Sequence, residues 1–160
     1  MMKRTTVLFL CTGNSARSQM AEGFLRELAG DRFDAQSAGL APVGLNPLAV
    51  QVMAEVGVDI SSQESKSLKG FLRKNEAQYV VFVCDKAEKS CPEIWPFATA
   101  TMCWPFPDPA AVQGDAEDCL EAFRRVRDQV RASIESWLAT DPESSATAAH
   151  KSKTTTCEED

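Results

Sequence analysis

Two short runs of apolar residues, Val7–Leu10 and Val80–Val83, constrain the fold of this chain more than any other feature. Each run is continuous rather than alternating, and such runs are typical of strands that are buried on both faces of a parallel sheet. Segments with helical periodicity lie between and after them. Because strands and helices alternate along the chain, we predict an α/β domain, a three-layer sandwich with a parallel sheet between helices.

The remaining elements are predicted from their boundary residues and from apolar periodicity. A helix is favoured where an Asn or Asp cap, a first-turn proline or a closing glycine frames apolar residues that recur every three to four positions. These signals predict helices over 19–29, 46–57 and 116–138, with Gly30 ending the first, and weaker strands over 33–37 and 100–104.

Composition limits the number of domains and the class of partner. The 160 residues, 44% of them hydrophobic, suffice for one domain, which we place at residues 1–139. Residues 140–160 are rich in Ser, Thr, Ala, Glu and Lys without an apolar period, so we expect a disordered tail. The net charge of −6 argues against a nucleic-acid partner, and no apolar run is long enough to span a membrane. We therefore expect a cytoplasmic monomer.

The six cysteines and the single histidine limit the available chemistry. His150 lies in the polar tail and no C-x2-C pair exists, so we predict no metal site. Thiols are reduced by default in the cytoplasm, so cysteines at special positions indicate catalysis rather than structural disulfides. Because the predicted domain contains no histidine, another group must activate any reactive thiol.

The segment Cys11–Ser18 joins the end of the first predicted strand to the start of the first helix. Backbone N–H groups at a helix N-terminus lack partners and carry partial positive charge, so they can hold a tetrahedral oxyanion together with a guanidinium group. The same field is expected to lower the pKa of Cys11. Gly13 and Asn14 tolerate the dihedral angles of a tight loop, and Ser18 is expected to hydrogen-bond the sulfur. The predicted oxyanion-binding residues are Thr12, Gly13, Asn14, Ser15, Ala16, Arg17 and Ser18.

Cys84 follows the second apolar strand just as Cys11 follows the first. Parallel strands end at the same edge of a sheet, where α/β proteins keep their functional sites. Neighbouring strands lie about 4.8 Å apart, so the two thiols can reach bonding distance after a modest movement. Cys91 lies seven residues beyond Cys84, across the polar segment 85–90. We therefore predict a thiol–disulfide relay through Cys84 and Cys91.

The other cysteines are interpreted as structural. Cys119 and Arg125 repeat the C-x5-R spacing of the loop, which is common by chance, but they fall inside the predicted last helix with no glycine between them. Cys103 and Cys119 are taken as core fillers and Cys157 as a thiol of the tail.

Asp108 and Pro109 follow the last strand candidate. An Asp-Pro pair by itself usually marks a turn. At the same sheet edge as a nucleophile, however, a carboxylic acid can protonate a leaving oxygen. We therefore predict Asp108 as the general acid.

Together these motifs resemble the thioredoxin-coupled arsenate reductases. The resemblance extends over roughly residues 5–138 and rests on Cys11–Gly23, Ser37–Gly39, Asn46-Pro47, Gly57–Ser61, Cys84, Cys91-Pro92, Asp108-Pro109 and Phe123–Asp128. It implies the fold of the low-molecular-weight tyrosine phosphatases, with a four-stranded parallel sheet and flanking helices. It also implies arsenate as the substrate and thioredoxin as the electron donor, with no cofactor.

The same resemblance gives each predicted catalytic residue a role. Cys11 attacks arsenate, which the loop and Arg17 hold, and Asp108 protonates the departing oxygen. Cys84 then attacks Cys11, which releases arsenite and leaves a Cys11–Cys84 disulfide. Cys91 attacks Cys84, and thioredoxin reduces the resulting Cys84–Cys91 disulfide.

Two positions depart from the family pattern. Ala16 stands where relatives often have a further cysteine, which this mechanism does not use. Lys66 stands where potassium-binding relatives have an aspartate that acts with Asn14, Glu22 and Ser37. Because the Lys66 ammonium can reach the place of the ion, we expect little response to potassium.

Two other functions share part of the pattern. A protein tyrosine phosphatase uses the same loop and acid, but that family usually has aromatic residues after Asp-Pro, where this chain has Ala110 and Ala111. The phosphatase reaction would also have no use for Cys84 and Cys91. A redox-sensing module that binds an oxyanion and a partner is the third interpretation, and it leaves the combination of acid, loop and relay unexplained.

Overall fold

The computed structural model describes residues 4–74, 77–84 and 100–142. Its strands are β1 (Thr5–Cys11), β2 (Phe33–Gly39), β3 (Tyr79–Phe82) and β4 (Ala100–Cys103). Its helices are α1 (Arg17–Ala29), α2 (Pro47–Glu55), α3 (Leu68–Lys74) and α5 (Ala116–Ala139), and η1 (Pro109–Ala111) is a short 3-10 turn. Every strand and helix predicted from the sequence is therefore present.

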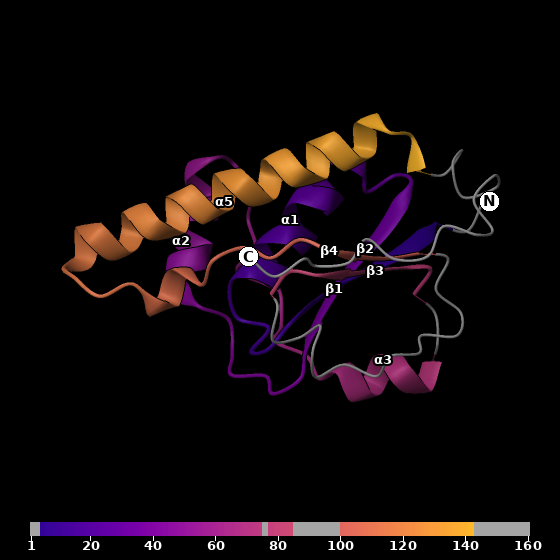
Figure 1. Ribbon diagram of the computed structural model, residues 1–160, viewed down its shortest axis with the longest axis horizontal. Coiled ribbons are helices and arrows are strands. Elements are labelled where there is room, and N and C mark those ends of the chain that lie inside the picture. Colours follow the sequence, from indigo (N-terminus) through magenta and orange to yellow (C-terminus); the bar gives the residue numbers. More distant parts are fainter. Residues whose placement is uncertain (1–3, 75–76, 85–99, 143–160) are drawn as a thin grey trace.

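The strands form one parallel sheet in the order β2-β1-β3-β4. Figure 1 shows α1, α2 and α5 on one face of the sheet and α3 on the opposite face. The predicted three-layer α/β sandwich with a four-stranded parallel sheet is therefore confirmed. Strands β1 and β3 are neighbours, with Leu10 beside Phe82 in register, so their C-terminal ends meet at one edge.

The hydrophobic core holds the elements that carry this edge. Val7, Leu8 and Phe9 of the central strand β1 are fully buried, as expected for a strand covered on both faces. Helix α1 adds buried side chains from Met20 and Phe24. Helix α5 contributes one apolar stripe, formed by Phe123, Val126, Val130 and Ile134. Burial of each such large side chain stabilises the fold by roughly 1.5–3 kcal/mol, so β1 and α1 lie in the most strongly held part of the molecule.

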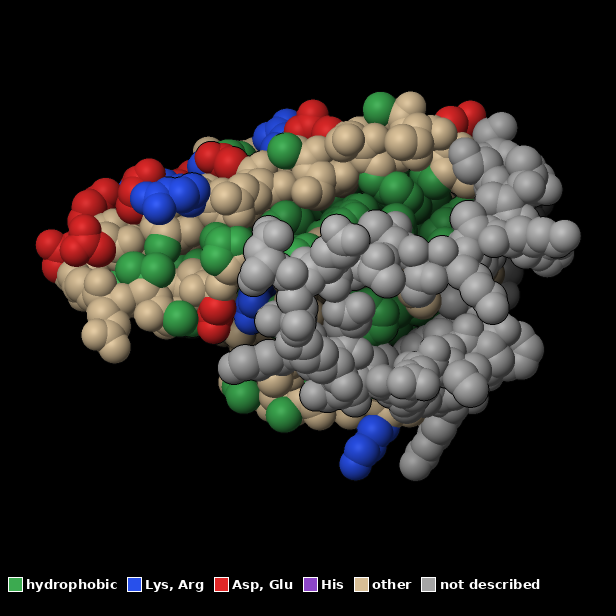
Figure 2. Space-filling model, in the orientation of Figure 1, with side chains coloured by type: hydrophobic (Ala, Val, Ile, Leu, Met, Phe, Trp, Pro, Cys, Tyr) green, Lys and Arg blue, Asp and Glu red, His purple; other side chains and the backbone are tan. Residues whose placement is uncertain are grey.

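A group of ion pairs ties α2 to α5. Glu55, at the end of α2, accepts hydrogen bonds of 2.8 Å from Arg124 and of 2.8 Å from Arg127, both on α5. The Arg124 guanidinium, helped by Arg127, lowers the pKa of the Glu55 carboxyl below its usual value. Figure 2 shows the charged side chains gathered at this end of the molecule. Each exposed pair stabilises the fold little by itself because solvent screens it, but together the pairs link α2 to α5.

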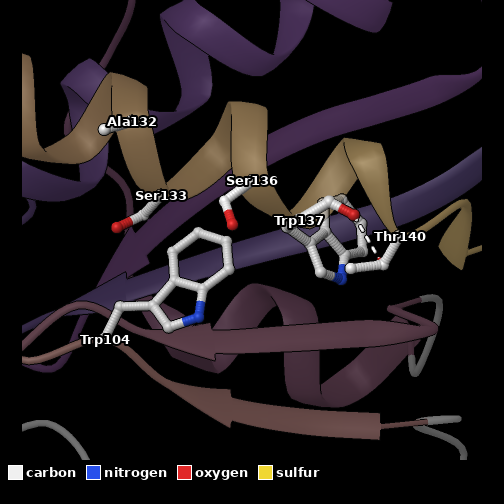
Figure 3. A pocket seen from close by; sticks show the side chains of 6 residues that line it. All are labelled: Trp104, Ala132, Ser133, Ser136, Trp137 and Thr140. Carbon is white, nitrogen blue, oxygen red and sulfur yellow. Dashed lines mark hydrogen bonds between the residues drawn. The ribbon is translucent and has the colours of Figure 1, made fainter.

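Aromatic side chains pack α5 against the sheet. Trp137 of α5 contacts Phe33 and Tyr79, with ring centroids 5.2 and 5.3 Å apart. Trp104, which follows β4, and Trp137 line an open groove of about 400 Å³ with Ala132, Ser133, Ser136 and Thr140 (Figure 3). The lining of this groove includes no residue of the Cys11–Ser18 loop.

Helix α3 was not predicted, because its seven residues make only about two turns and include Gly70, too little for a visible apolar period. Gly30 ends α1 as predicted, with φ of −65° and ψ of −16° in the right-handed region. Within the described residues, none of the helices combines the length and the hydrophobicity that a membrane span requires.

Candidate active site

Cys11 is the last residue of β1, and the loop that follows leads directly into α1 at Arg17. Its side chain is buried, with 4% of the residue exposed. Ala16 occupies the N-cap of α1, and no side chain caps this helix within the described residues. The first backbone N–H groups of α1 therefore lack a side-chain acceptor, which is the condition for binding an anion at a helix N-terminus.

The carbonyl groups of the loop are held from outside by the segment 40–46. Ala41 N donates to Thr12 O at 2.9 Å, Val43 N donates to Gly13 O at 3.0 Å, and Asn46 N donates to Ser15 O at 2.9 Å. With these carbonyls engaged on the outer side, the loop can turn its N–H groups toward its own centre. No residue pattern in the sequence indicated this supporting role.

Asn14 fixes the inner conformation of the loop. It is fully buried and has a φ of +46°, the left-handed conformation expected for a tight loop residue. Its Oδ1 accepts a hydrogen bond of 2.7 Å from Lys66 N, and its Nδ2 donates to Ser18 Oγ at 2.8 Å. Gln19 Nε2 donates to the backbone oxygen of Asn14 at 3.0 Å. A hydrogen bond from Ser18 to the Cys11 sulfur stays a prediction.

Two glycines let the loop pack closely, in ways the sequence analysis did not foresee. A Cβ atom on Gly39 would lie 2.8 Å from Thr12 O and 2.9 Å from Asn14 N, so only glycine fits beside this backbone. Gly13 was expected to supply an unusual dihedral angle. Its φ is not positive, and a Cβ there would lie 3.0 Å from Cγ2 of Val43, an exposed side chain.

Arg17 and the predicted acid Asp108 lie on the same side of the site. Arg17 Nη1 donates to Phe106 O at 3.1 Å, and its Nη2 lies 3.9 Å from Asp108 Oδ1. Asp108 also caps η1 by accepting a hydrogen bond of 3.0 Å from Ala110 N. Its side chain remains 47% exposed, so solvent reaches the carboxyl group. The fold thus brings Arg17 and Asp108 together although 91 positions separate them in the sequence.

Cys84 lies beside the nucleophile, as the pairing of β1 with β3 requires. It is buried, and its sulfur lies 3.6 Å from Thr12 Oγ1 in a hydrogen-bonding contact. A hydrogen bond with Cys84 is also the largest single cause that raises the pKa of the Cys11 thiol. The structure therefore places the two thiols in direct contact at the mouth of the loop.

The pKa of Cys11 corrects the sequence prediction. Contact with the Cys84 thiol and burial raise the pKa of Cys11, and they outweigh Arg17 and the Thr12 amide, which lower it. The prediction considered only the loop and the helix, which act in the expected direction. It missed that a second thiol in a buried site disfavours a thiolate on the first.

The predictions for the remaining cysteines have different outcomes. Cys91 and Cys157 lie outside the described residues. Cys119 is half-buried in α5, where its sulfur contacts Val112 O at 3.7 Å, so it does not fill the core as predicted. Cys103, at the end of β4, is half-buried and packs against the core as predicted, but it is also disulfide-bonded, which the prediction did not include. In the described part of the chain, His, Cys, Asp and Glu side chains form no group suited to hold a metal ion.

Lys66 lies where the sequence analysis expected it. Its Nζ lies 3.3 Å from Glu22 Oε1, and the same oxygen accepts a hydrogen bond of 3.0 Å from Ser37 Oγ. Arg26 holds the other oxygen of Glu22 at 3.3 Å. Glu22 is almost fully buried, so these cations compensate a carboxylate that would otherwise be costly. Through its own N–H, Lys66 also holds Asn14, which links this ion pair to the loop.

We predict that replacing Cys84 by alanine lowers the pKa of Cys11, because the strongest influence that raises it is removed. The rate of Cys11 alkylation by iodoacetamide, followed against pH by mass spectrometry, measures this pKa. Its midpoint should move to lower pH in Cys84→Ala, and should not move in the control Cys119→Ala. An unchanged or higher midpoint in Cys84→Ala would contradict the thiol contact.

We also predict that Lys66 makes the fold insensitive to the identity of the alkali cation. Exchanging potassium for sodium at constant ionic strength should leave the thermal midpoint unchanged, because an ammonium group already neutralises Glu22. Lys66→Met should destabilise the fold by about 1–3 kcal/mol, since a buried carboxylate loses a partner. Lys69→Met, the same change at an exposed position, is the control. A potassium-specific rise in the wild-type midpoint would show that an ion binds despite Lys66.

Residues 6–146 match the family described as low molecular weight phosphotyrosine protein phosphatase. A protein named arsenate reductase from Shouchella clausii is 43% identical over 139 residues, which cover 87% of this chain and 99% of that protein. The arsenate reductase of Bacillus subtilis is 44% identical over 129 residues, covering 81% of this chain and 91% of that protein.

Solved structures of the same two kinds of protein are also similar to this chain. A structure described as an arsenate reductase in the phosphate-binding state has a TM-score of 0.73 at 34% identity, covering 85% of this chain and 98% of that one. A low-molecular-weight protein tyrosine phosphatase from T. tengcongensis has a TM-score of 0.70 at 26% identity, covering 85% of this chain and 99% of that one. The loop at Cys11, the four-stranded parallel sheet and these matches together place the chain in the low molecular weight phosphotyrosine protein phosphatase family.

Proposed function

We propose that this chain is an arsenate reductase in which Cys11 and Cys84 supply the two electrons for each arsenate. The observation that carries the proposal is the contact between these buried thiols at the end of β1. A phosphatase needs one reactive thiolate and has no use for a second thiol beside it. A reductase needs a second thiol within reach, because the product of the oxidation is a disulfide. The relatives named arsenate reductases support this choice.

Arsenate is a tetrahedral oxyanion, and the loop offers the groups that bind one. The N–H groups at the start of α1 lack a side-chain cap, and the fork of Arg17 lies at the same end of the helix. The hydrogen bond to Phe106 O and the nearby Asp108 carboxylate hold the Arg17 guanidinium toward the site rather than toward solvent. Binding therefore requires little reordering of Arg17.

In the first step the Cys11 thiolate attacks arsenic, and one arsenate oxygen leaves as water. The pair of thiols loses its first proton as a unit, and Arg17 and the Thr12 amide favour the negative charge on Cys11. Asp108, half-exposed beside Arg17, donates a proton to the departing oxygen. A positioned general acid typically accelerates such a step by about 10²–10⁴-fold.

In the second step Cys84 attacks the sulfur of Cys11. The sulfur–arsenic bond breaks, its electron pair goes to arsenic, and arsenite leaves with a Cys11–Cys84 disulfide remaining. Arsenic is reduced by two electrons and the two thiols are oxidised to one disulfide. The register of β1 and β3 favours this step, because Cys84 needs to move only a short distance.

In the last steps Cys91 attacks Cys84, and a dithiol reductant of the thioredoxin class reduces the Cys84–Cys91 disulfide. This part rests on the sequence alone, since Cys91 lies outside the described residues. The exchange restores Cys11 as a thiol. The enzyme then returns to its starting state after receiving two electrons from the reductant.

The proposed activity is tested by arsenate-dependent oxidation of NADPH in the presence of thioredoxin and thioredoxin reductase. Hydrolysis of p-nitrophenyl phosphate is measured in parallel. The wild-type protein should oxidise NADPH only when arsenate is added, and Cys11→Ser should lose both activities because serine is not ionised by this site. Phosphate-ester hydrolysis without arsenate reduction would favour the phosphatase alternative.

The relay predicts different failures for its two later cysteines. Cys84→Ser should lose even the first arsenite, because no thiol is in place to resolve the arsenic adduct. Cys91→Ser should still release about one arsenite per enzyme and then lose most of its turnover with thioredoxin. Ester hydrolysis should persist in both variants, and Cys119→Ser should behave like the wild type. Arsenite measured by chromatography after one equivalent of arsenate distinguishes these cases. Full turnover in Cys91→Ser would show that Cys91 is not required.

A further inference from the structure

Four consecutive carbonyl groups of the loop are each held by a hydrogen bond, but not by the same part of the chain. Backbone N–H groups of the segment that supports the loop from outside hold the carbonyls of Thr12, Gly13 and Ser15. The fourth carbonyl, on Asn14, accepts a hydrogen bond of 3.0 Å from the side-chain amide of Gln19, in the first turn of α1. Gln19 therefore completes the set of anchors.

The surroundings of Gln19 determine which way its amide points. The side chain is fully buried. Its Nε2 faces three oxygens, with Asn14 O at 3.0 Å, Asn14 Oδ1 at 3.1 Å and Glu64 O at 3.0 Å. Its Oε1 faces a donor, Gln63 Nε2, at 2.8 Å. The opposite orientation would set an oxygen against three acceptors, so only one orientation of the amide satisfies these neighbours.

Gln63 holds Gln19 at a second point. Its Nε2 also donates a hydrogen bond of 3.0 Å to Gln19 O, and its Oε1 accepts a hydrogen bond from Arg26, which lies one helical stretch further along α1. A buried amide whose partners are themselves held has few other conformations open to it. Gln19 therefore presents its N–H groups to Asn14 in a fixed geometry.

The Asn14 carbonyl is important because it belongs to the same peptide unit as the N–H of Ser15. The peptide bonds of the loop are trans, and in a trans peptide the C=O and the following N–H point in opposite directions. An anchor on Asn14 O therefore fixes the direction of the Ser15 N–H, away from Gln19. In the same way, the anchors from the supporting segment fix the N–H groups of Gly13 and Ala16.

We propose that Gln19 is a positioning residue for the oxyanion, which acts through the peptide unit between Asn14 and Ser15. Its hydrogen bond to Asn14 O aims the Ser15 N–H at the anion before the anion arrives. Asn14 has a φ of +46°, a conformation that is unfavourable for a residue with a side chain and that needs support from its surroundings. The inference rests on the proposed use of the loop as an oxyanion site and names the residue that prepares one of its donors.

The first test measures the affinity of the loop for inorganic phosphate. Gln19→Met keeps an unbranched side chain of similar length but removes its hydrogen bonds. The dissociation constant of phosphate, measured by protection of Cys11 against iodoacetamide, should rise by roughly 10–100-fold, the effect of losing one well-directed hydrogen bond to an anion. The matched control is Gln78→Met, which removes the acceptor of a 2.7 Å hydrogen bond from Thr6 N near the opposite end of β1 and should leave this constant unchanged.

The second test separates positioning from stability by following single amides in ¹H–¹⁵N spectra. In the wild type, phosphate should move the amide proton resonances of Gly13, Ser15 and Ala16 downfield, because each N–H donates to the anion. In Gln19→Met the change at Ser15 should be lost or much reduced. Gly13 and Ala16 should still respond, since backbone groups hold the carbonyls that precede them. A general loss of stability would affect all three amides alike.

An unchanged phosphate dissociation constant in Gln19→Met, or an equal reduction at all three amides, would overturn the proposal. If circular dichroism shows that Gln19→Met does not fold, Gln19→Asn is measured in its place. Its amide is one methylene too short to reach Asn14 O, so the same loss at Ser15 is expected.

Phosphate binding keeps this test apart from arsenate reduction, because thiols do not reduce phosphate. A wild-type protein that binds phosphate but reduces no arsenate would contradict the proposed reductase function and leave the test of Gln19 intact. Arsenate reduction by the wild type, together with normal phosphate binding by Gln19→Met, would contradict only the positioning role. A wild-type protein that does not bind phosphate would overturn the role of Gln19 together with the oxyanion site.

Discussion

The parallel pairing of β1 with β3 is the constraint on which the rest of the site depends. It sets Leu10 beside Phe82, so the C-terminal ends of the two strands lie at one place. Cys11 and Cys84 meet there because the backbone ladder is in register, not because the thiols attract each other. The loop geometry, the pKa of Cys11 and the proposed chemistry all follow from this contact. A slip of one residue would turn Cys84 to the other face of the sheet and separate the thiols.

The conformation of the Cys11–Ser18 loop is held by neighbouring residues that take no part in the proposed reaction. The segment 40–46 holds its carbonyls, Gly39 lets the backbone approach, and Lys66 fixes Asn14 through a main-chain hydrogen bond. The ion pairs between α2 and α5 then hold the helix that follows this segment. The geometry at Cys11 thus depends on Gly39 and Lys66, which lie 28 and 55 positions further along the chain, and on α5, which lies more than 100 positions away.

The sequence predicted the strands, the long helices and the meeting of Cys11, Arg17, Cys84 and Asp108, because apolar runs and capping residues are local signals. It did not reveal α3, whose two turns carry too few apolar residues, or the direction of the Cys11 pKa, which depends on a thiol 73 positions away. The segment 40–46 supports the loop through its backbone N–H groups. Almost every residue type has such a group, so the sequence gives no signal of this role. The disulfide of Cys103 was not predicted either, because a cysteine that packs against the core gives no local signal of its bonding partner.

The missing side-chain cap of α1 has a consequence for the whole molecule. Most helices satisfy their first N–H groups internally, by a Ser, Thr, Asp or Asn side chain, as Asp115 does for α5. At Ala16 that task is left to whatever anion occupies the loop. Occupancy and folding therefore form one linked equilibrium, and a bound oxyanion at about 100 times its dissociation constant would add about 2.7 kcal/mol to the free energy of unfolding. An anion bound in the loop would therefore contribute to the stability of the fold as well as to the proposed chemistry.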